Sequence, residues 1–242
     1  MTAATSGRIV AIGGGGFSTE DYSLRQERWL LSLARRPRPR VLFVGTASGD
    51  RELYQLRFLR AFARLDCVAD TLAFFPYDMR RDYAAAVAEA DLVFVGGGNT
   101  PAMLAVWQSF GFDAALRRAW QAGTVLAGIS AGANCWFEHY VTDSVPGGGV
   151  RPGLGWLPGS FCPHLDSEAW RQSVLAAQPA PWLGAGEQVC ALYEGQQLAA
   201  VVHAAAGPAA PLAWQRRSGD AAHAVLTPEA LAVTPAAEHP PL

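Results

Sequence analysis

Lysine is absent from this chain of 242 residues, because all nineteen of its basic side chains are arginines. No lysine is therefore present to form a Schiff base with a carbonyl substrate or to bind phosphates in a P-loop. Charge is also sparse, since 17% of the residues are charged and the formal net charge is −2. This balance offers no basic field for nucleic acid or for an anionic membrane surface, so neither is expected as a partner.

Long hydrophobic runs and paired cysteines are also missing. Half of the residues are hydrophobic, yet no run is long enough to span a bilayer, and the first residues lack the basic-then-apolar order of a signal peptide. The four cysteines form no C-x-x-C pair: Cys67, Cys135, Cys162 and Cys190. These absences disfavour a disulfide framework and a metal site, and we expect a cytoplasmic protein with reduced, buried thiols.

Short apolar runs that end in glycine or small polar residues recur through the first part of the chain. They cover 8–12, 40–44, 91–95 and 124–127, with a further run at 71–75. Helix-compatible apolar spacing lies between them, at 52–65, 83–90 and 101–120. This alternation predicts an α/β fold, a doubly wound and mostly parallel sheet covered by helices on both faces. The glycine-rich stretches then meet at the carboxyl edge of the sheet, where such folds bind ligands.

The character of the sequence changes after Val141. The expected elements are a loop over 146–158, a helix over 167–177 and strands over 188–193 and 197–203. Strands over 212–216 and 222–226 would form a β-hairpin in the alanine- and proline-rich tail, followed by a frayed end. We therefore expect one α/β domain over 1–206 and a tail over 207–242 that is not an independent domain.

The segment Gly128-Ile129-Ser130-Ala131-Gly132 matches the G-x-S-x-G pattern of a nucleophile elbow. In such an elbow a strand turns sharply into a helix, and the glycines keep side chains out of the crowded turn. The serine projects at the tip, beside free N–H groups of the helix start that can hold an oxyanion. A turn rich in small residues with a surface serine produces the same pattern, so the motif alone leaves both interpretations open.

A serine nucleophile needs a base, and the chain contains five histidines. His164 follows a short apolar stretch on a loop, from which a side chain can reach into a crevice. His139 lies nine residues beyond Ser130, on the helix expected to begin at the elbow, and would point away. The remaining three carry no local motif and are expected at the surface: His203, His223 and His239. His164 is therefore the favoured base.

The base in turn needs an acidic partner to orient it. Asp143 would give the order Ser-Asp-His along the chain, Glu187 would give Ser-His-Glu, and Glu138 is a third option. Each of them is also compatible with a solvated surface carboxylate. The residues alone leave this choice open.

An oxyanion hole needs two N–H donors, and Ala131 supplies one because it follows the serine. The second is expected from Gly97, Gly98 or Asn99, where glycine allows close approach to a ligand. The same loop is also typical of a strand-to-helix connection capped by Asn99 or Thr100, with proline at the first helical position. Both interpretations can hold together.

The first glycine run, over 13–16, suggests dinucleotide binding only weakly. Ser18 occupies the place of the third glycine of that fingerprint, and no acidic residue ends a second strand at the usual distance. Nucleotide binding is therefore disfavoured, and the sequence implies no metal or organic cofactor.

The glycine run after the first strand, the Gly96–Thr100 loop, the elbow and the Cys162-Pro163-His164 loop resemble, in this order, peptidase E. This is the aspartyl dipeptidase family S51 of serine peptidases, with cyanophycinases among its wider relatives, and the resemblance covers roughly residues 8–203. It implies a fold similar to class I glutamine amidotransferases (flavodoxin-like), with serine in place of cysteine. The C-terminal hairpin resembles the longer-tailed branch, in which the tail contributes to a dimer interface, so a homodimer is consistent with it.

Residue by residue, Ser130 matches the family's nucleophile and His164 its base. The family's acid has been placed just after the elbow, matching Asp143, and also in a turn before a late strand, where Glu187 is the nearest match and is favoured. The resemblance further implies Gly98 and Ala131 as oxyanion-hole donors and Gly97, Asn99 and Arg171 at the substrate.

The family's best-known members cleave dipeptides with N-terminal aspartate, whose carboxylate they bind through an arginine on the helix after the histidine loop. Arg171 lies on the expected helix, although the loop is shorter here and the position does not match clearly. The resemblance therefore implies a serine peptidase of short peptides with Asp-X specificity left open. Two other classes stay open: an esterase or amidase that shares G-x-S-x-G, and a non-catalytic protein that binds a small ligand in the crevice.

Overall fold

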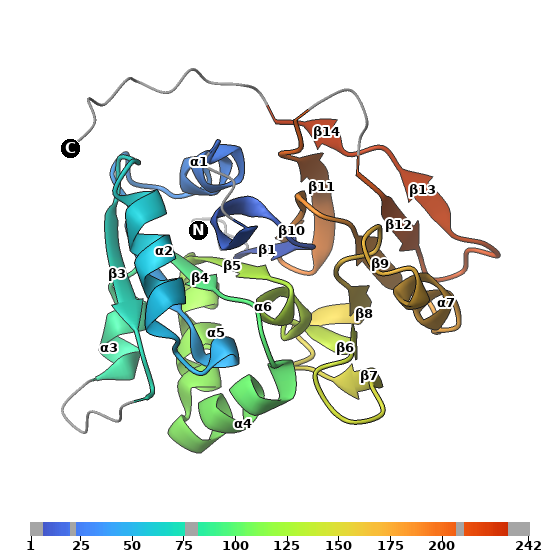
Figure 1. Ribbon diagram of the computed structural model, residues 1–242, viewed down its shortest axis with the longest axis horizontal. Coiled ribbons are helices and arrows are strands. Elements are labelled where there is room, and N and C mark those ends of the chain that lie inside the picture. Colours follow the sequence, from blue (N-terminus) through green and yellow to red (C-terminus); the bar gives the residue numbers. More distant parts are fainter. Residues whose placement is uncertain (1–6, 20–22, 76–81, 207–210, 232–242) are drawn as a thin grey trace, which may run out of the picture.

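The computed structural model describes residues 7–19, 23–75, 82–206 and 211–231, and its strands form two neighbouring sheets (Figure 1). The larger sheet has eight strands in the order β14-β11-β10-β1-β5-β4-β2-β3. Their bounds are β1 (Arg8–Ile12), β2 (Arg40–Val44), β3 (Val68–Leu72), β4 (Leu92–Val95), β5 (Val125–Ile129), β10 (Val189–Glu194), β11 (Gln197–His203) and β14 (Glu229–Ala230). Strands β1 to β5 pair in parallel, whereas β10 and β11 join them antiparallel.

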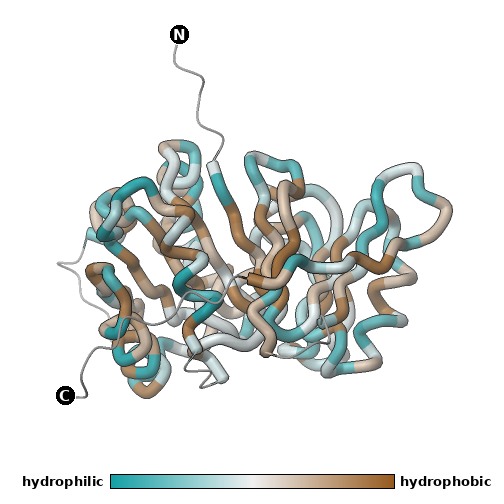
Figure 2. Tube along the Cα trace, turned by 90° about the horizontal axis from the view of Figure 1, so that it is seen from above, coloured by the Kyte–Doolittle hydropathy of each residue, from teal (hydrophilic) through white to brown (hydrophobic). Residues whose placement is uncertain are grey.

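Helices cover both faces of this sheet. Because side chains alternate along a strand, Ile9 and Ala11 of β1 join the core under α3 (Tyr83–Ala88), α4 (Thr100–Phe110) and α5 (Phe112–Ala122). Val10 and Ile12 join the opposite core under α1 (Arg25–Ser32) and α2 (Glu52–Phe62). Hydrophobic segments accordingly run through the interior of the molecule (Figure 2). The predicted doubly wound, mostly parallel α/β fold is confirmed.

The stretch of helix-compatible spacing over 101–120 is helical, and it forms two helices, α4 and α5, rather than one. Gly111 lies between them with φ 62°, a left-handed conformation that glycine adopts without the penalty of a Cβ atom. The expected strand at 71–75 is also displaced, since β3 ends at Leu72.

The second sheet contains six strands in the order β13-β12-β9-β8-β6-β7. Their bounds are β6 (Phe137–Thr142), β7 (Gly149–Pro152), β8 (Leu157–Cys162), β9 (Trp182–Ala185), β12 (Ala213–Arg216) and β13 (Ala224–Leu226). The loop expected over 146–158 is therefore wrong, since it contains β7 and the first residues of β8. The helix after the elbow, α6 (Ala131–Asn134), has only four residues, because Phe137 and Tyr140 enter the core from a strand.

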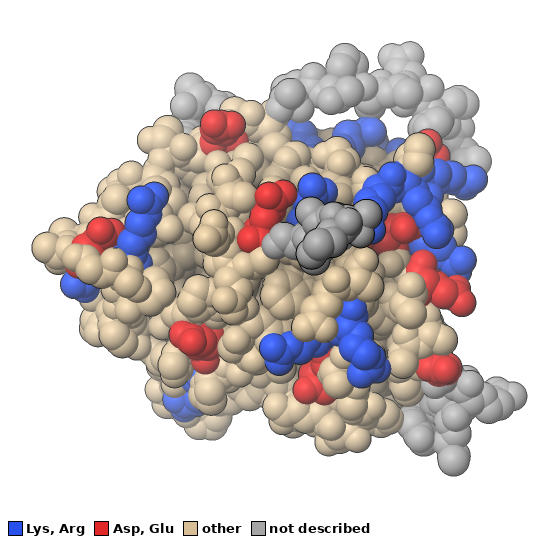
Figure 3. Space-filling view, turned by 180° about the vertical axis from the view of Figure 1, so that it is seen from behind, with Lys and Arg blue, Asp and Glu red and all other residues tan. Residues whose placement is uncertain are grey.

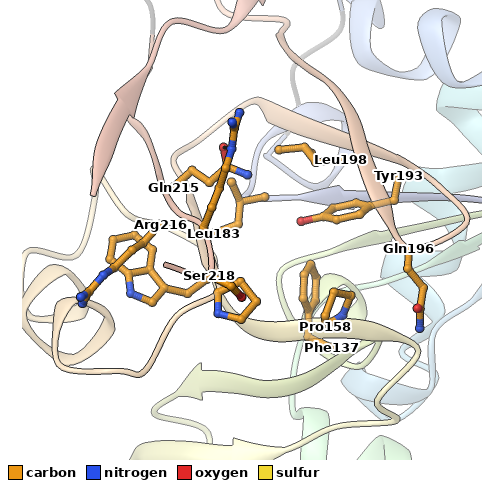
Figure 4. A pocket seen from close by; sticks show the side chains of 12 residues that line it. Phe137, Pro158, Leu183, Tyr193, Gln196, Leu198, Gln215, Arg216 and Ser218 are labelled. Atoms are coloured by element: carbon orange, nitrogen blue, oxygen red, sulfur yellow. Dashed lines mark hydrogen bonds between the residues drawn. The ribbon is translucent and has the colours of Figure 1, made fainter. Parts of the chain in front are cut away.

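The predicted C-terminal hairpin is confirmed in β12 and β13, which pair antiparallel. Strand β12 also pairs with β9, so the tail extends the second sheet. Between the sheets, Gln215 and Arg216 of β12 line a small cavity of about 130 Å³ with Tyr193 and Leu198 of the larger sheet (Figure 4). The expected frayed end, from residue 232, lies outside the described residues, and the division into 1–206 and 207–242 stays a prediction.

The surface carries charges of both signs. Arginine and carboxylate side chains neighbour one another on the back of the molecule (Figure 3), and exposed pairs such as Arg40 with Glu89 contribute little stability individually. The four cysteines are free and buried. Across the described ranges, none of the helices has the length and apolar character needed to cross a bilayer. The short elements that complete the fold are η1 (Gly16–Thr19), η2 (Thr46–Ser48) and α7 (Trp170–Ala176).

Candidate active site

Ser130 occupies a strained turn between β5 and α6. Its backbone adopts φ 54° and ψ −110°, a conformation that non-glycine residues rarely take and that persists only where the surroundings enforce it. A Cβ atom at Gly128 would collide with the carbonyl of Gly132, and one at Gly132 would collide with the carbonyl of Val95. Both glycines of the G-x-S-x-G motif are thus required by close backbone packing, as a nucleophile elbow demands.

Three side chains form one hydrogen-bonded chain at this turn. The Ser130 hydroxyl lies 2.8 Å from Nε2 of His164, and Nδ1 of His164 lies 2.5 Å from a carboxylate oxygen of Glu187. Ser130 follows β5 of the larger sheet, whereas His164 and Glu187 follow β8 and β9 of the second sheet. His164 also has a positive φ, 55°. The site therefore forms where the carboxyl ends of strands from both sheets meet.

Neighbouring groups hold the Glu187 side chain and its backbone. The Ser167 hydroxyl donates to the same carboxylate oxygen at 3.1 Å, and the Glu187 N–H donates to the Asp166 carboxylate at 2.9 Å. Burial raises the pKa of Glu187, but the hydrogen bond and charge of His164, together with Ser167, outweigh it, so the net pKa is lowered. Glu187 is thus an ionised carboxylate suited to accept a hydrogen bond from His164 Nδ1–H.

The glycine run after β1 packs against the turn that carries Glu187. A Cβ atom at Gly14 would collide with the Glu187 carboxylate, and one at Gly13 would collide with the Gly186 carbonyl. The N–H of Gln188 donates to the Gly14 carbonyl at 2.9 Å. The absence of side chains in this run therefore allows the turn to approach β1.

The other candidate acids contact different partners. Asp143 accepts a hydrogen bond from Arg171 at 3.2 Å, and Glu138 accepts one from the Gly159 N–H at 2.7 Å. Neither of these partners is an imidazole. Among the three carboxylates considered from the sequence, Glu187 is the one that lies against His164.

The other described histidines lie elsewhere in the fold. His139 is exposed on β6, so the expectation that it lies on a helix is wrong. His203 is buried at the end of β11, 6% exposed, which corrects its expected surface position. His223 stacks on Trp214, with the ring centroids 4.5 Å apart, and His239 lies outside the described residues.

Two backbone N–H groups of the loop after β4 are bonded within the protein. The N–H of Gly97 donates to the Tyr54 hydroxyl at 3.2 Å, and the N–H of Asn99 donates to the Ala47 carbonyl at 2.7 Å. Gly98 lies between them with φ 141°, and a Cβ atom there would collide with the Ala47 carbonyl. This leaves the Gly98 N–H as the loop's candidate donor, on the rim of the cavity that contains Ser130.

Ala131 and Asn99 begin helices beside Ser130. Ala131 is the first residue of α6, so its N–H has no partner within the helix. Asn99 caps α4 by accepting the Ala102 N–H at 2.9 Å, and its Nδ2 donates to the Ser144 carbonyl at 2.8 Å. The predicted cap at Asn99 is confirmed, whereas Pro101 takes the second rather than the first helical position.

Arg171 lies in a cavity of about 220 Å³ that opens beside Ser130. Its side chain, on α7, is nearly buried at 4% exposure. It donates to Glu168 at 2.7 Å, to Asp143 at 3.2 Å and to the Val141 carbonyl at 3.3 Å. A guanidinium held by three hydrogen bonds thus lines the same small cavity as the proposed nucleophile.

Sequence reasoning missed the groups that hold the candidate residues in place. Tyr54 lies on α2, where its spacing resembles that of a core residue, and nothing in the sequence indicates its bond to Gly97. Asp166 and Ser167 follow His164 closely, so their proximity to the loop was a usable signal. Their contact with Glu187 depends on a strand pairing that the sequence does not show.

Comparisons with known proteins identify the family of this chain and support its fold. The model of peptidase family S51 matches residues 9–203. The uncharacterized peptidase YgaJ of Bacillus subtilis (strain 168) is 47% identical over 165 residues, which cover 68% of this chain and 71% of that protein.

Two solved structures share the fold. A peptidase from an acI-B1 Actinobacterium aligns with a TM-score of 0.66 and 19% identity, covering 93% of this chain and 96% of its own. A putative peptidase E protein from Listeria monocytogenes EGD-e aligns with a TM-score of 0.63 and 14% identity, covering 82% of this chain and 99% of its own. Because the family model matches most of the chain, this chain belongs to peptidase family S51.

Proposed function

We propose that this chain is a serine peptidase that hydrolyses short peptides. Ser130 attacks the scissile carbonyl while His164 takes its proton and later passes it to the leaving amine. Glu187 orients His164 and stabilises the imidazolium that forms. The observation that carries the proposal is the chain of hydrogen bonds from the Ser130 hydroxyl through both imidazole nitrogens to the Glu187 carboxylate.

The oxyanion of the tetrahedral intermediate is held by the N–H groups of Gly98 and Ala131. One such donor typically lowers the barrier by about 3 kcal/mol. The strained turn at Ser130 supports this role, because it brings the hydroxyl and the first N–H of α6 to the same point. Water then attacks the acyl-enzyme carbonyl, with His164 taking the proton of the water and returning it to Ser130.

The residue N-terminal to the scissile bond is proposed to be acidic, with N-terminal aspartate fitting best. The cavity beside Ser130 is small, and Arg171 provides a guanidinium of fixed orientation for a carboxylate. The Asp143 side chain, whose carboxylate contacts Arg171, is 60% exposed. A substrate carboxylate can therefore replace it on the guanidinium. A dipeptide that begins with aspartate is therefore the first substrate to test.

A dipeptide library screened against the wild type and Ser130→Ala tests the proposal. We expect Asp-X dipeptides to be cleaved fastest, and Ser130→Ala to lose at least about 1,000-fold in kcat. Labelling of Ser130 by a fluorophosphonate provides a readout that does not depend on the choice of substrate. If the folded wild-type protein is not labelled and cleaves none of the dipeptides, a ligand-binding homologue without catalysis is favoured.

A further inference from the structure

Three consecutive glycines begin the loop after β4: Gly96, Gly97 and Gly98. Glycine accepts a wide range of backbone conformations, so this sequence does not by itself fix the direction of an N–H group. An oxyanion donor is effective only when it already points to where the negative charge develops. Groups outside the loop must therefore supply the rigidity that the glycines lack.

The peptide that carries the candidate donor is held on either side. The Gly98 N–H belongs to the peptide between Gly97 and Gly98. Before this peptide, the Gly97 N–H donates to the Tyr54 hydroxyl at 3.2 Å. After it, the Asn99 N–H donates to the Ala47 carbonyl at 2.7 Å. The direction of the Gly98 N–H is therefore set by one backbone bond and by one side chain, Tyr54.

The Tyr54 side chain is itself fixed in place. Its ring centroid lies 5.8 Å from that of Phe17 and 5.1 Å from that of Phe43. Its hydroxyl shares a hydrogen bond of 2.8 Å with the Ser18 hydroxyl. A Cβ atom at Gly96 would lie 2.8 Å from the ring, so the glycine there admits the ring against the loop. Burial raises the pKa of Tyr54, so the phenol stays neutral.

This contact lies close to the proposed nucleophile without being part of the cavity in front of it. A Cβ atom built at Gly97 would lie 3.5 Å from Cβ of Ser130 and 3.9 Å from its hydroxyl. Gly98 lines the cavity that contains Ser130, whereas Tyr54 does not. The Tyr54 hydroxyl can therefore affect the reaction through the backbone of the loop.

On the basis of the proposed peptidase function, we infer that Tyr54 is a positioning residue, whose hydroxyl fixes the Gly97 N–H and so aims the Gly98 N–H at the carbonyl oxygen above Ser130. When Ser130 attacks, this oxygen becomes an anion and meets a donor that needs no rearrangement. Tyr54 itself exchanges no proton with the substrate. Because the donor acts on the transition state, losing its alignment slows the chemical step and leaves substrate binding nearly unchanged.

The variant Tyr54→Phe tests this role, because it removes the hydroxyl and keeps the ring in its packing. We expect kcat for Asp-Leu to fall about tenfold, less than the loss of a whole donor, with KM within about twofold of wild type. Labelling of Ser130 by a fluorophosphonate should slow by a similar factor, since the phosphoryl oxygen occupies the same hole. A merely structural role would lower the melting temperature and leave both rates unchanged.

Tyr193→Phe is the matched control. Tyr193 is also a buried tyrosine of the larger sheet, at 6% exposure, but it lines the small cavity between the sheets instead of contacting the loop. This variant should keep the wild-type kcat and labelling rate. If the wild type is active and Tyr54→Phe matches it in both rates, the inference is overturned while the peptidase proposal stands.

Backbone NMR of the three ¹⁵N-labelled proteins tests the same contact without a substrate, and so covers a wild type that cleaves no peptide. In Tyr54→Phe, we expect the Gly97 N–H to exchange with solvent about fivefold faster, because the protection by one hydrogen bond is lost. The Gly98 amide signal should shift in this variant and stay in place in Tyr193→Phe. Unchanged Gly97 exchange together with an unchanged Gly98 signal would refute the positioning role, whatever the activity of the wild type.

Discussion

At the scale of single residues, the contacts of His164 determine which carboxylate can act on it. Glu187 lies 2.5 Å from Nδ1 of His164, whereas Asp143 contacts Arg171 instead. Replacing Glu187 with glutamine keeps the shape but allows the wrong imidazole tautomer, so we expect kcat to fall by about 1,000- to 10,000-fold. Asp143→Asn should act mainly on KM, because Asp143 shares the guanidinium proposed to bind substrate. Steady-state kinetics of both variants on Asp-Leu check this assignment, and equal losses in kcat would contradict it.

The lowered pKa of Glu187 predicts a pH dependence of stability. The unfolded chain takes up a proton at the ordinary glutamate pKa of about 4.3, above the pKa in the folded protein. The stabilisation that ionised Glu187 gives to the folded protein is therefore complete above the unfolded pKa. It is lost as the pH falls through the lower pKa of the folded protein. The difference in free energy of unfolding between wild type and Glu187→Gln should shrink as the pH falls from about 6 to about 3. Urea unfolding at several pH values measures it, and a difference that grows on acidification would exclude this linkage.

The limits of sequence reasoning also appear at this scale. Ser130 and His164 could be proposed because each lies in a short pattern that ends an apolar run. The choice between Asp143 and Glu187 could not be made from residue types, since both are carboxylates in turns and chain order permits either. It depends on how β8 and β9 pair, a contact between segments about twenty residues apart.

At the scale of elements, the glycine run after β1 has a positional role for Glu187. Gly14→Ala would place a methyl group against the Glu187 carboxylate, and we expect kcat to fall by about tenfold or more, because small displacements at a reacting site are costly. Gly111→Ala is the control, since its Cβ would lie in open space and should cost about 1 kcal/mol of stability through its left-handed backbone. Kinetics and thermal unfolding separate the two effects. Similar activity losses in both variants would refute the positional role.

The distribution of apolar runs and glycines along the chain explains which elements could be predicted. Strands β1, β2, β4 and β5 are continuous apolar runs ended by glycine, and both the runs and their order can be read from the sequence. Strands β6 to β8 are not continuous apolar runs: β6 has exposed polar residues, β7 begins with glycine and ends with proline, and a Pro-Gly pair interrupts β8. Without an apolar run, their residues look like loop in the sequence. The second sheet was therefore not foreseen, although it carries two of the three residues of the hydrogen-bonded chain.

At the scale of the whole molecule, the site depends on two sheets that must keep their relative position. Ser130 follows a strand of one sheet, and His164 and Glu187 follow strands of the other. The turn that contains Glu187 touches both: the Gln188 N–H donates to the Gly14 carbonyl just after β1, and the Gly186 N–H donates to the Leu212 carbonyl at 2.8 Å, just before β12. The C-terminal tail thereby contributes to the geometry of the site without lining it.

Removing residues 207–242 should therefore affect activity as well as stability. The deletion takes β12 from the edge of β9 and the Leu212 carbonyl from Gly186. It also removes Trp214 from its packing against the small core that contains Leu165, next to His164. We expect a lower melting temperature and a kcat reduced by about 10- to 100-fold, with circular dichroism showing that the remaining α/β fold persists. Kinetics at a temperature well below the melting point separate misplacement of Glu187 from unfolding, and a truncated chain with wild-type kcat would show that the tail is dispensable for the site.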